Sequence, residues 1–355
     1  MQHNPYTLLF GKEPSQMISR KADSAVILSS FLSEQPSQQV YMITGVRGTG
    51  KTVFMTEIMR QLSRQDQWVV VELNPERNLL EDLAAKLNSD RLLAGIFQKA
   101  NIDLSFFGIG VKIEGSHPTV NLETALSHML ESLKKNGKRV LIAIDEVTST
   151  PGMREFAHSF QMFVRQDLPV FLIMTGLYQN IDLLQNEKGL TFLYRAPKIT
   201  LAPLSIREIS IQYQETFELD QKSGDTMATM TQGYSFAFQV LGYLTWEQNG
   251  NYGAVVDEYK RYLADYSYDK IWTELSPGDR KIAHGIAASG SSKILDIRNY
   301  MKIDTNQFNP YRKRLIKKGI LNGDLYGHVS FVLPYFKEYI LENYSDLNGA
   351  NDLLC

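Results

Sequence analysis

A glycine-rich segment is the part of the chain whose residue types and spacing point most directly to chemistry. Residues 45–52, GVRGTGKT, fit the pattern G-x-x-x-x-G-K-[ST] between an apolar run and a helical pattern. The glycines let the backbone wrap around phosphate oxygens, and the start of the following helix adds a positive field. Lys51 would reach the β- and γ-phosphates, and Thr52 would bind Mg²⁺. The predicted phosphate-binding residues are therefore Gly45, Val46, Arg47, Gly48, Thr49, Gly50, Lys51 and Thr52.

Two adjacent carboxylates form the second candidate feature. Asp145 and Glu146 follow the apolar run Val140–Ile144. At the carboxyl edge of a parallel sheet, Asp145 would lie beside the phosphate loop and hold Mg²⁺, directly or through water. Successive residues at a strand end point in different directions, so Glu146 could instead orient and deprotonate an attacking water.

The segments that must position these residues alternate short apolar runs with helical patterns. This alternation predicts an α/β domain whose mostly parallel sheet is flanked by helices, because its strands are continuously apolar. We predict strands at Val40–Thr44, Trp68–Leu73, Arg139–Ile144, Val170–Thr175 and Lys198–Leu201. Helices are expected near Arg20–Ser33, Thr52–Arg64, Leu79–Asn88, Leu122–Asn136 and Met153–Gln166, and an inserted hairpin at Leu104–Gly115.

Composition limits the class of protein. The 355 residues are 43% hydrophobic and 21% charged, which excludes a largely disordered or fibrous chain. The 37 Lys and Arg against 39 Asp and Glu give a net charge of −2, so nucleic-acid binding would require local clustering. The one cysteine, Cys355, excludes an intramolecular disulfide and a cysteine metal cluster. No apolar run approaches the ~20 residues of a membrane span, so we expect a soluble cytoplasmic protein.

The chain divides by character into three predicted domains: an α/β domain at 1–203, a helical lid at 204–268 and a C-terminal domain at 269–355. In the last, Ser276–Tyr344 shows a helix-helix-helix-hairpin-helix pattern, which resembles a winged helix-turn-helix. Pro277–Gly319 holds ten Lys or Arg against three Asp, a net charge of +7. The candidate contacts to double-stranded DNA are Arg312, Lys313, Arg314, Lys317 and Lys318. Complementing a helix dipole, or docking a protein, would also account for these residues.

The two phosphate-site motifs resemble those of AAA+ ATPases and the related STAND ATPases. Within that superfamily, the chain is similar to bacterial and archaeal ATP-binding proteins akin to origin-recognition initiators, which carry a C-terminal winged helix. The resemblance implies ATP and Mg²⁺ as ligands. It also implies that Thr175 senses the γ-phosphate and that Arg195 completes a neighbouring subunit's site. Arg195 could equally be a surface residue that caps the preceding helix.

The lid departs from the family pattern. The stretch Gly233–Phe238 holds no arginine where many AAA+ lids carry one, and Gly233-Tyr234-Ser235 looks like the Gly-x-Pro turn of STAND proteins with Ser in place of Pro. This difference favours an ATPase that turns over slowly and acts as a nucleotide-controlled switch, which the C-terminal winged helix would couple to DNA binding. The alternatives are a non-hydrolysing switch that docks a protein partner and an ATP-dependent transcription regulator. A homo-oligomer is a further expectation if Arg195 acts between subunits.

Overall fold

The computed structural model describes residues 3–8, 14–100, 102–105, 117–118 and 121–344, which divide into two compact units. The α/β unit consists of Arg20–Thr44 and Lys51–Thr200. The helical unit consists of Gly45–Gly50 and the described parts of residues 1–19 and 201–355. The first six residues of the predicted phosphate loop therefore group with the helical unit, and its last two residues group with the α/β unit.

A five-stranded sheet forms the centre of the α/β unit. Its strands are β1 (Val40–Thr44), β2 (Trp68–Leu73), β5 (Arg139–Ile144), β6 (Val170–Gly176) and β7 (Lys198–Thr200). The order is β2-β5-β6-β1-β7, and every neighbouring pair is parallel. Every residue of β1 and β6 is buried, as expected for strands covered on both faces. The predicted α/β fold with a parallel sheet is confirmed.

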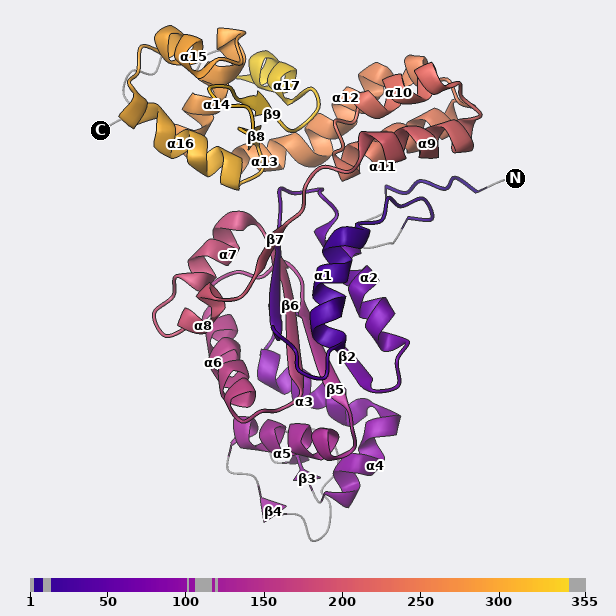
Figure 1. Cartoon of the computed structure of the whole chain (residues 1–355), viewed down its shortest axis with the longest axis vertical. Coiled ribbons are helices and arrows are strands. Elements are labelled where there is room, and N and C mark those ends of the chain that lie inside the picture. The colour runs from indigo at the N-terminus through magenta and orange to yellow at the C-terminus, as the bar shows by residue number, and fades with distance from the viewer. Residues whose placement is uncertain (1–2, 9–13, 101, 106–116, 119–120, 345–355) are drawn as a thin grey trace. The chain divides into compact units, whose positions relative to one another are not determined.

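Helices cover both faces of this sheet, with α1 and α2 on one side and α6 and α7 on the other (Figure 1). Phe156, Phe160 and Phe163 line one face of α6 and are fully buried. Burial of each such side chain contributes about 1.5–3 kcal/mol to stability. The helices of the unit are α1 (Lys21–Leu32), α2 (Lys51–Ser63), α3 (Leu79–Ser89), α4 (Arg91–Lys99), α5 (Leu122–Lys135), α6 (Pro151–Arg165), α7 (Tyr178–Gln185) and α8 (Thr191–Tyr194).

Most predicted elements of this unit occur within two residues of their expected bounds. Helices α4, α7 and α8 were not predicted from the sequence; the start of α4 is fixed by the side chain of Asp90 accepting the backbone N–H of Leu92. The predicted hairpin at Leu104–Gly115 lies mostly outside the described residues. On either side of it, β3 (Ile102–Asp103) and β4 (His117–Pro118) pair in parallel.

The helical unit has its own core of buried aromatic and aliphatic side chains. Tyr213, Phe238 and Tyr259 are fully buried within it, and Tyr213 donates a hydrogen bond to the carbonyl of Phe238 at 2.7 Å. This bond satisfies a polar group that burial would otherwise leave without a partner. The first elements after Leu201 are α9 (Ile206–Phe217), α10 (Gln221–Thr229), α11 (Ser235–Glu247), η2 (Tyr252–Val255), α12 (Val256–Leu263), the π-helical turn η3 (Ala264–Tyr268) and α13 (Asp269–Thr273).

The C-terminal part of this unit follows the predicted order of three helices, a hairpin and a helix. Its elements are α14 (Pro277–Ser289), α15 (Ile294–Met301), α16 (Thr305–Lys317), the antiparallel pair β8 (Leu321–Asn322) and β9 (Ser330–Phe331), and α17 (Phe336–Asn343). Asp304 and Gln307 form a capping box at the start of α16. Among the helices that the structure describes, none has the length and apolar character to cross a membrane.

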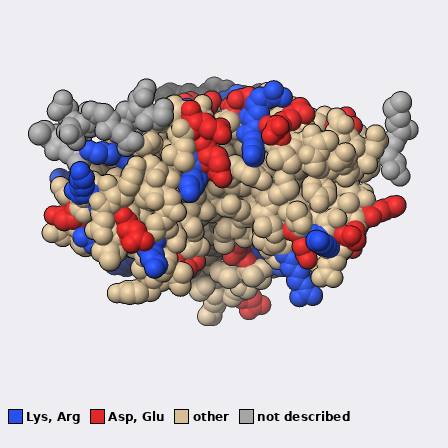
Figure 2. Space-filling model, turned by 90° about the horizontal axis from the view of Figure 1, so that it is seen from above, with Lys and Arg blue, Asp and Glu red and all other residues tan. Residues whose placement is uncertain are grey.

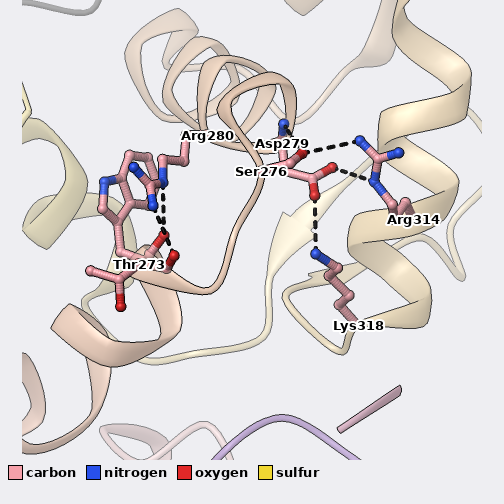
Figure 3. Close-up of polar contacts among 7 residues, drawn as sticks. Thr273, Ser276, Asp279, Arg280, Arg314 and Lys318 are labelled. Atoms are coloured by element: carbon pink, nitrogen blue, oxygen red, sulfur yellow. Dashed lines mark hydrogen bonds and ion pairs between the residues drawn. The ribbon is translucent and has the colours of Figure 1, made fainter. Parts of the chain in front are cut away.

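A buried carboxylate joins α14 to α16 (Figure 3). The side chain of Asp279, which is fully buried, accepts Nε of Arg314 at 2.7 Å and Nζ of Lys318 at 3.1 Å. Arg314 also donates to the hydroxyl of Ser276 at 3.3 Å. Two cations therefore compensate a charge that would be costly to bury alone.

Helix α14 is also hydrogen-bonded to α13, through Arg280. Arg280 donates from Nε to the carbonyl of Trp272 at 2.9 Å and from a terminal guanidinium nitrogen to the carbonyl of Thr273 at 2.8 Å (Figure 3). These carbonyls lie in the last turn of α13, and that of Trp272 also accepts the backbone N–H of Leu275 at 3.1 Å. Arg280 thus fixes the corner between α13 and α14.

Asp279→Asn should lower the free energy of unfolding of the helical unit by about 3 kcal/mol, because it leaves Arg314 and Lys318 facing each other without the compensating carboxylate. Urea unfolding followed by circular dichroism measures this change. Asp257→Asn, an exposed acid in the same unit, is the matched control and should shift stability by less than about 0.5 kcal/mol. An unchanged midpoint for Asp279→Asn would contradict the assigned role of this carboxylate.

Candidate nucleotide site

The carboxylate of Asp145 is the centre of the candidate site in the α/β unit. Thr52 donates its hydroxyl to Oδ2 of Asp145 at 2.6 Å, and Thr175 donates its hydroxyl to Oδ1. Thr175 is fully buried, whereas Asp145 is half-buried. Two hydroxyls from distant parts of the chain thus hold one carboxylate in a fixed orientation.

The strand order explains why these three residues meet. Strand β6 lies between β1 and β5, and Met174 in β6 is level with Ile144 in β5. Thr175 is the next residue of β6 and Asp145 directly follows β5, so the two residues lie side by side at the same sheet edge. Thr52 lies in the first turn of α2. The structure therefore brings together three of the predicted site residues.

Glu146 has an unusual backbone conformation. Its φ is 52°, in the left-handed region that glycine favours. Its N–H points to Oδ1 of Asp145 at 3.0 Å and to the hydroxyl of Thr175 at 3.3 Å. The next residue, Val147, donates its N–H to the carbonyl of Thr175 at 2.9 Å, which fixes the turn. The exposed side chain of Glu146 is thereby directed by a strained backbone, a feature that is common at functional sites.

The phosphate-loop residues Gly45–Gly50 have well-defined contacts within the helical unit. Tyr234 donates its hydroxyl to the carbonyl of Arg47 at 2.7 Å, and Ser235 donates to the carbonyl of Thr49 at 3.0 Å. Gly48 and Gly50 have φ values of 79° and 85°, which only glycine adopts without strain. The loop thus has a specific backbone shape in which glycine is required.

The contacts of Tyr234 and Ser235 are the part of this geometry that the sequence analysis did not predict. The sequence marks Gly233-Tyr234-Ser235 only as a variant of the Gly-x-Pro turn, and Tyr234 is buried. However, Tyr234 and Ser235 are 187 and 186 residues from Arg47 and Thr49 in the chain, and no spacing rule pairs them.

The other predicted site residues, among them Lys51 and Arg195, lie in different parts of the structure. Lys51 is the first residue of α2, as a phosphate-loop lysine should be. Arg195 is exposed at the C-terminal end of α8, where its N–H bonds the carbonyl of Phe192. Of the five candidate DNA contacts, Arg314 and Lys318 form the ion pairs with Asp279 described above.

Two family models match parts of the chain. Residues 27–166 match a model described as an ATPase domain predominantly from Archaea. Residues 266–340 match a model described as a domain of unknown function, DUF8462. No curated protein matches the chain.

Solved structures with a similar fold include a Walker-type ATPase of Pyrococcus abyssi, with a TM-score of 0.61 and 16% identity over 91% of this chain and 96% of that one. Cdc6p from Pyrobaculum aerophilum aligns at 13% identity and a TM-score of 0.47, covering 93% and 95% of the two chains. The ORC1 protein of Aeropyrum pernix, solved in complex with DNA, aligns at 15% identity and a TM-score of 0.41, covering 93% and 94%. Residues 27–166 thus match an archaeal ATPase domain model, and the chain shares the fold of a Walker-type ATPase, in agreement with the two phosphate-site motifs.

Proposed function

We propose that this protein binds ATP with Mg²⁺ at residues 45–52 and hydrolyses it slowly, acting as a nucleotide-controlled switch. The observation that carries the proposal is the pair of hydroxyls, from Thr52 and Thr175, on the carboxylate of Asp145. This arrangement lies at the carboxyl edge of a parallel sheet, where α/β proteins bind ligands, and includes Thr52, the last residue of the phosphate-loop sequence.

The donor set fits a magnesium ion. The hydroxyl of Thr52 and the carboxylate of Asp145 are hard oxygen ligands 2.6 Å apart. Mg²⁺ usually takes one or two protein ligands of this kind and completes its shell with water and substrate phosphates. When bound, the ion would neutralise charge on the β- and γ-phosphates. In this proposal Thr175 orients Asp145 and senses the γ-phosphate through it.

Glu146 is the proposed general base. Its exposed carboxylate follows Asp145, and the left-handed backbone turns it away from the direction of the strand. A carboxylate in this position could orient a water and accept its proton during attack on the γ-phosphate. Lys51 would stabilise the charge on the phosphates. Arg195 is proposed to act on a neighbouring subunit's site.

Slow turnover is expected from the lid. The described segment Gly233–Phe238 supplies backbone and hydroxyl contacts to the phosphate loop but has no arginine to stabilise charge in the transition state. A switch that retains ATP does not require rapid hydrolysis. Turnover well above about 1 per second with saturating ATP would contradict this part of the proposal.

Lys51→Ala and Glu146→Gln should separate binding from hydrolysis. Lys51→Ala removes a charged contact to phosphate, so the Kd for ATP should rise about 10- to 100-fold. Glu146→Gln should leave the Kd unchanged and slow hydrolysis at least about 100-fold. Equilibrium titration with a fluorescent ATP analogue and single-turnover hydrolysis of radiolabelled ATP measure the two effects. Equal hydrolysis by Glu146→Gln and wild type would exclude Glu146 as the base.

Glu146→Gly should abolish hydrolysis and also stabilise the α/β unit by about 1 kcal/mol, because glycine adopts a positive φ without strain. Asp167→Gly is the matched control, since Asp167 lies in the same unit at a φ of 57° and is 95% exposed. It should give a similar gain in stability with unchanged hydrolysis. Thermal unfolding and single-turnover assays measure both quantities. Destabilisation by Glu146→Gly would show that the carboxylate has a structural role.

A second candidate function, binding of double-stranded DNA, is favoured by the order of elements in the C-terminal part. Three helices followed by an antiparallel hairpin are the elements of a winged helix, with α16 as the recognition helix. Lys313 on α16 is exposed. On the face seen in Figure 2, basic and acidic side chains are interspersed and form no broad basic field. On that face, DNA binding would depend on a few local contacts.

DNA binding is tested by titrating a mixed-sequence duplex between about 50 and 200 mM salt. If Lys313 contacts a phosphate, Lys313→Ala should weaken binding and reduce the slope of log K against log salt by about 1. Lys188→Ala, an exposed lysine of the α/β unit, is the charge-matched control and should change neither quantity. Identical curves for Lys313→Ala and wild type would contradict the DNA contact. Tyr326, which is 98% exposed in the β8–β9 loop, would then be the next residue to test for protein docking.

A further inference from the structure

Three consecutive carbonyls of the phosphate loop are bound by three consecutive lid residues. The carbonyl of Arg47 accepts the hydroxyl of Tyr234 at 2.7 Å, and that of Gly48 accepts the N–H of Phe236 at 3.0 Å. The carbonyl of Thr49 accepts the hydroxyl of Ser235 at 3.0 Å. All six residues belong to the helical unit. Each of these three loop carbonyls thus accepts a hydrogen bond from the segment Tyr234–Phe236.

The close approach of Tyr234 and Phe236 to the loop explains why position 48 is glycine, although the sequence motif does not require it. Position 48 is one of the four variable positions of G-x-x-x-x-G-K-[ST]. A Cβ on Gly48 would lie 2.2 Å from Oη of Tyr234 and 3.0 Å from Cβ of Phe236. The φ of 79° also disfavours other residues. A side chain at this position would therefore displace the lid residues from the loop.

Tyr234 is itself held firmly. Its hydroxyl lies 2.7 Å from that of Ser267, in the π-helical turn η3, and its ring is buried. Burial raises the pKa of Tyr234 well above its ordinary value, so the phenol keeps the proton that it donates to Arg47. The turn before it is fixed by the N–H of Leu204, which bonds the carbonyl of Gly233 at 2.7 Å.

Holding the carbonyls also fixes the N–H groups of the loop. A peptide unit is planar, and its C=O and N–H point in opposite directions. The carbonyls of Arg47 and Thr49 share peptide planes with the N–H groups of Gly48 and Gly50. A phosphate loop binds its ligand through such N–H groups. The lid hydroxyls therefore determine which way two of them point.

We propose that Tyr234 and Ser235 are positioning residues for the phosphate loop, and that their hydroxyls orient the N–H groups of Gly48 and Gly50 for binding nucleotide phosphates. This inference rests on the proposed function of residues 45–52. It makes phosphate affinity a property of the lid as well as of the motif, and it assigns a role to the serine that replaces the proline of the Gly-x-Pro pattern.

The ion pair between Arg47 and Glu274 provides a control on the same loop. Its N···O distance is 3.0 Å, and the two side chains are 32% and 21% exposed. It contacts the loop through a side chain and leaves the backbone carbonyls to the lid. A partly exposed ion pair contributes little to stability. Glu274→Gln should therefore change the Kd for ATP less than about twofold.

The test compares Tyr234→Phe, Ser235→Ala, Ser235→Thr and Glu274→Gln in the full-length chain, by titration with a fluorescent ATP analogue and by steady-state hydrolysis. Tyr234→Phe and Ser235→Ala each remove one neutral hydrogen bond, so each should raise the Kd about three- to tenfold. The KM for ATP should rise with the Kd while kcat changes less. Ser235→Thr keeps the hydroxyl and should restore affinity.

Thermal unfolding of each variant identifies any loss of fold. If Tyr234→Phe is unstable, the comparison of Ser235→Ala with Ser235→Thr still tests the proposal. Wild-type affinity in Ser235→Ala, with Lys51→Ala defective, would overturn this inference and leave the proposed function intact. Unaltered binding by Lys51→Ala would instead overturn the proposed function itself. Equal weakening by Ser235→Ala and Ser235→Thr would also contradict a role for the hydroxyl.

Discussion

The orientation of one carboxylate, that of Asp145, depends on the topology of the whole α/β unit. Its two hydroxyl donors, Thr52 and Thr175, are 93 and 30 residues away in the chain. They reach it only because β6 lies between β1 and β5 and all three strands run in the same direction. The buried apolar strands fix this order, so the core of the sheet and the geometry of the candidate site have one physical cause.

The phosphate loop has a second dependence, on the helical unit. Its carbonyls are bound by Tyr234, Ser235 and Phe236, whereas Lys51 begins α2 of the α/β unit. The shape of residues 45–50 therefore depends on contacts within the helical unit and not only on the glycines of the motif.

Basic residues at α16 differ in their roles: some compensate a buried carboxylate, and others are exposed to solvent. A net charge of +7 over Pro277–Gly319 suggested a nucleic-acid surface, but Arg314 and Lys318 compensate the buried Asp279. Their charge therefore holds α14 against α16. Lys313 is exposed on the same helix. Electrostatic partners 35 and 39 residues apart cannot be paired from composition, because the pairing depends on which helix faces touch.

The sequence alone determined the local features: five strands and five helices of the α/β unit, the Gly45–Thr52 loop, and the Asp145-Glu146 pair at a strand end. These follow from apolar periodicity and from motifs whose residues are close in the chain. Only the tertiary structure revealed the two hydroxyls on Asp145, the left-handed backbone of Glu146 and the lid hydroxyls on the loop carbonyls. Each of those depends on strand order or on contacts between segments distant in sequence, where side-chain chemistry is satisfied by neighbours that spacing does not specify.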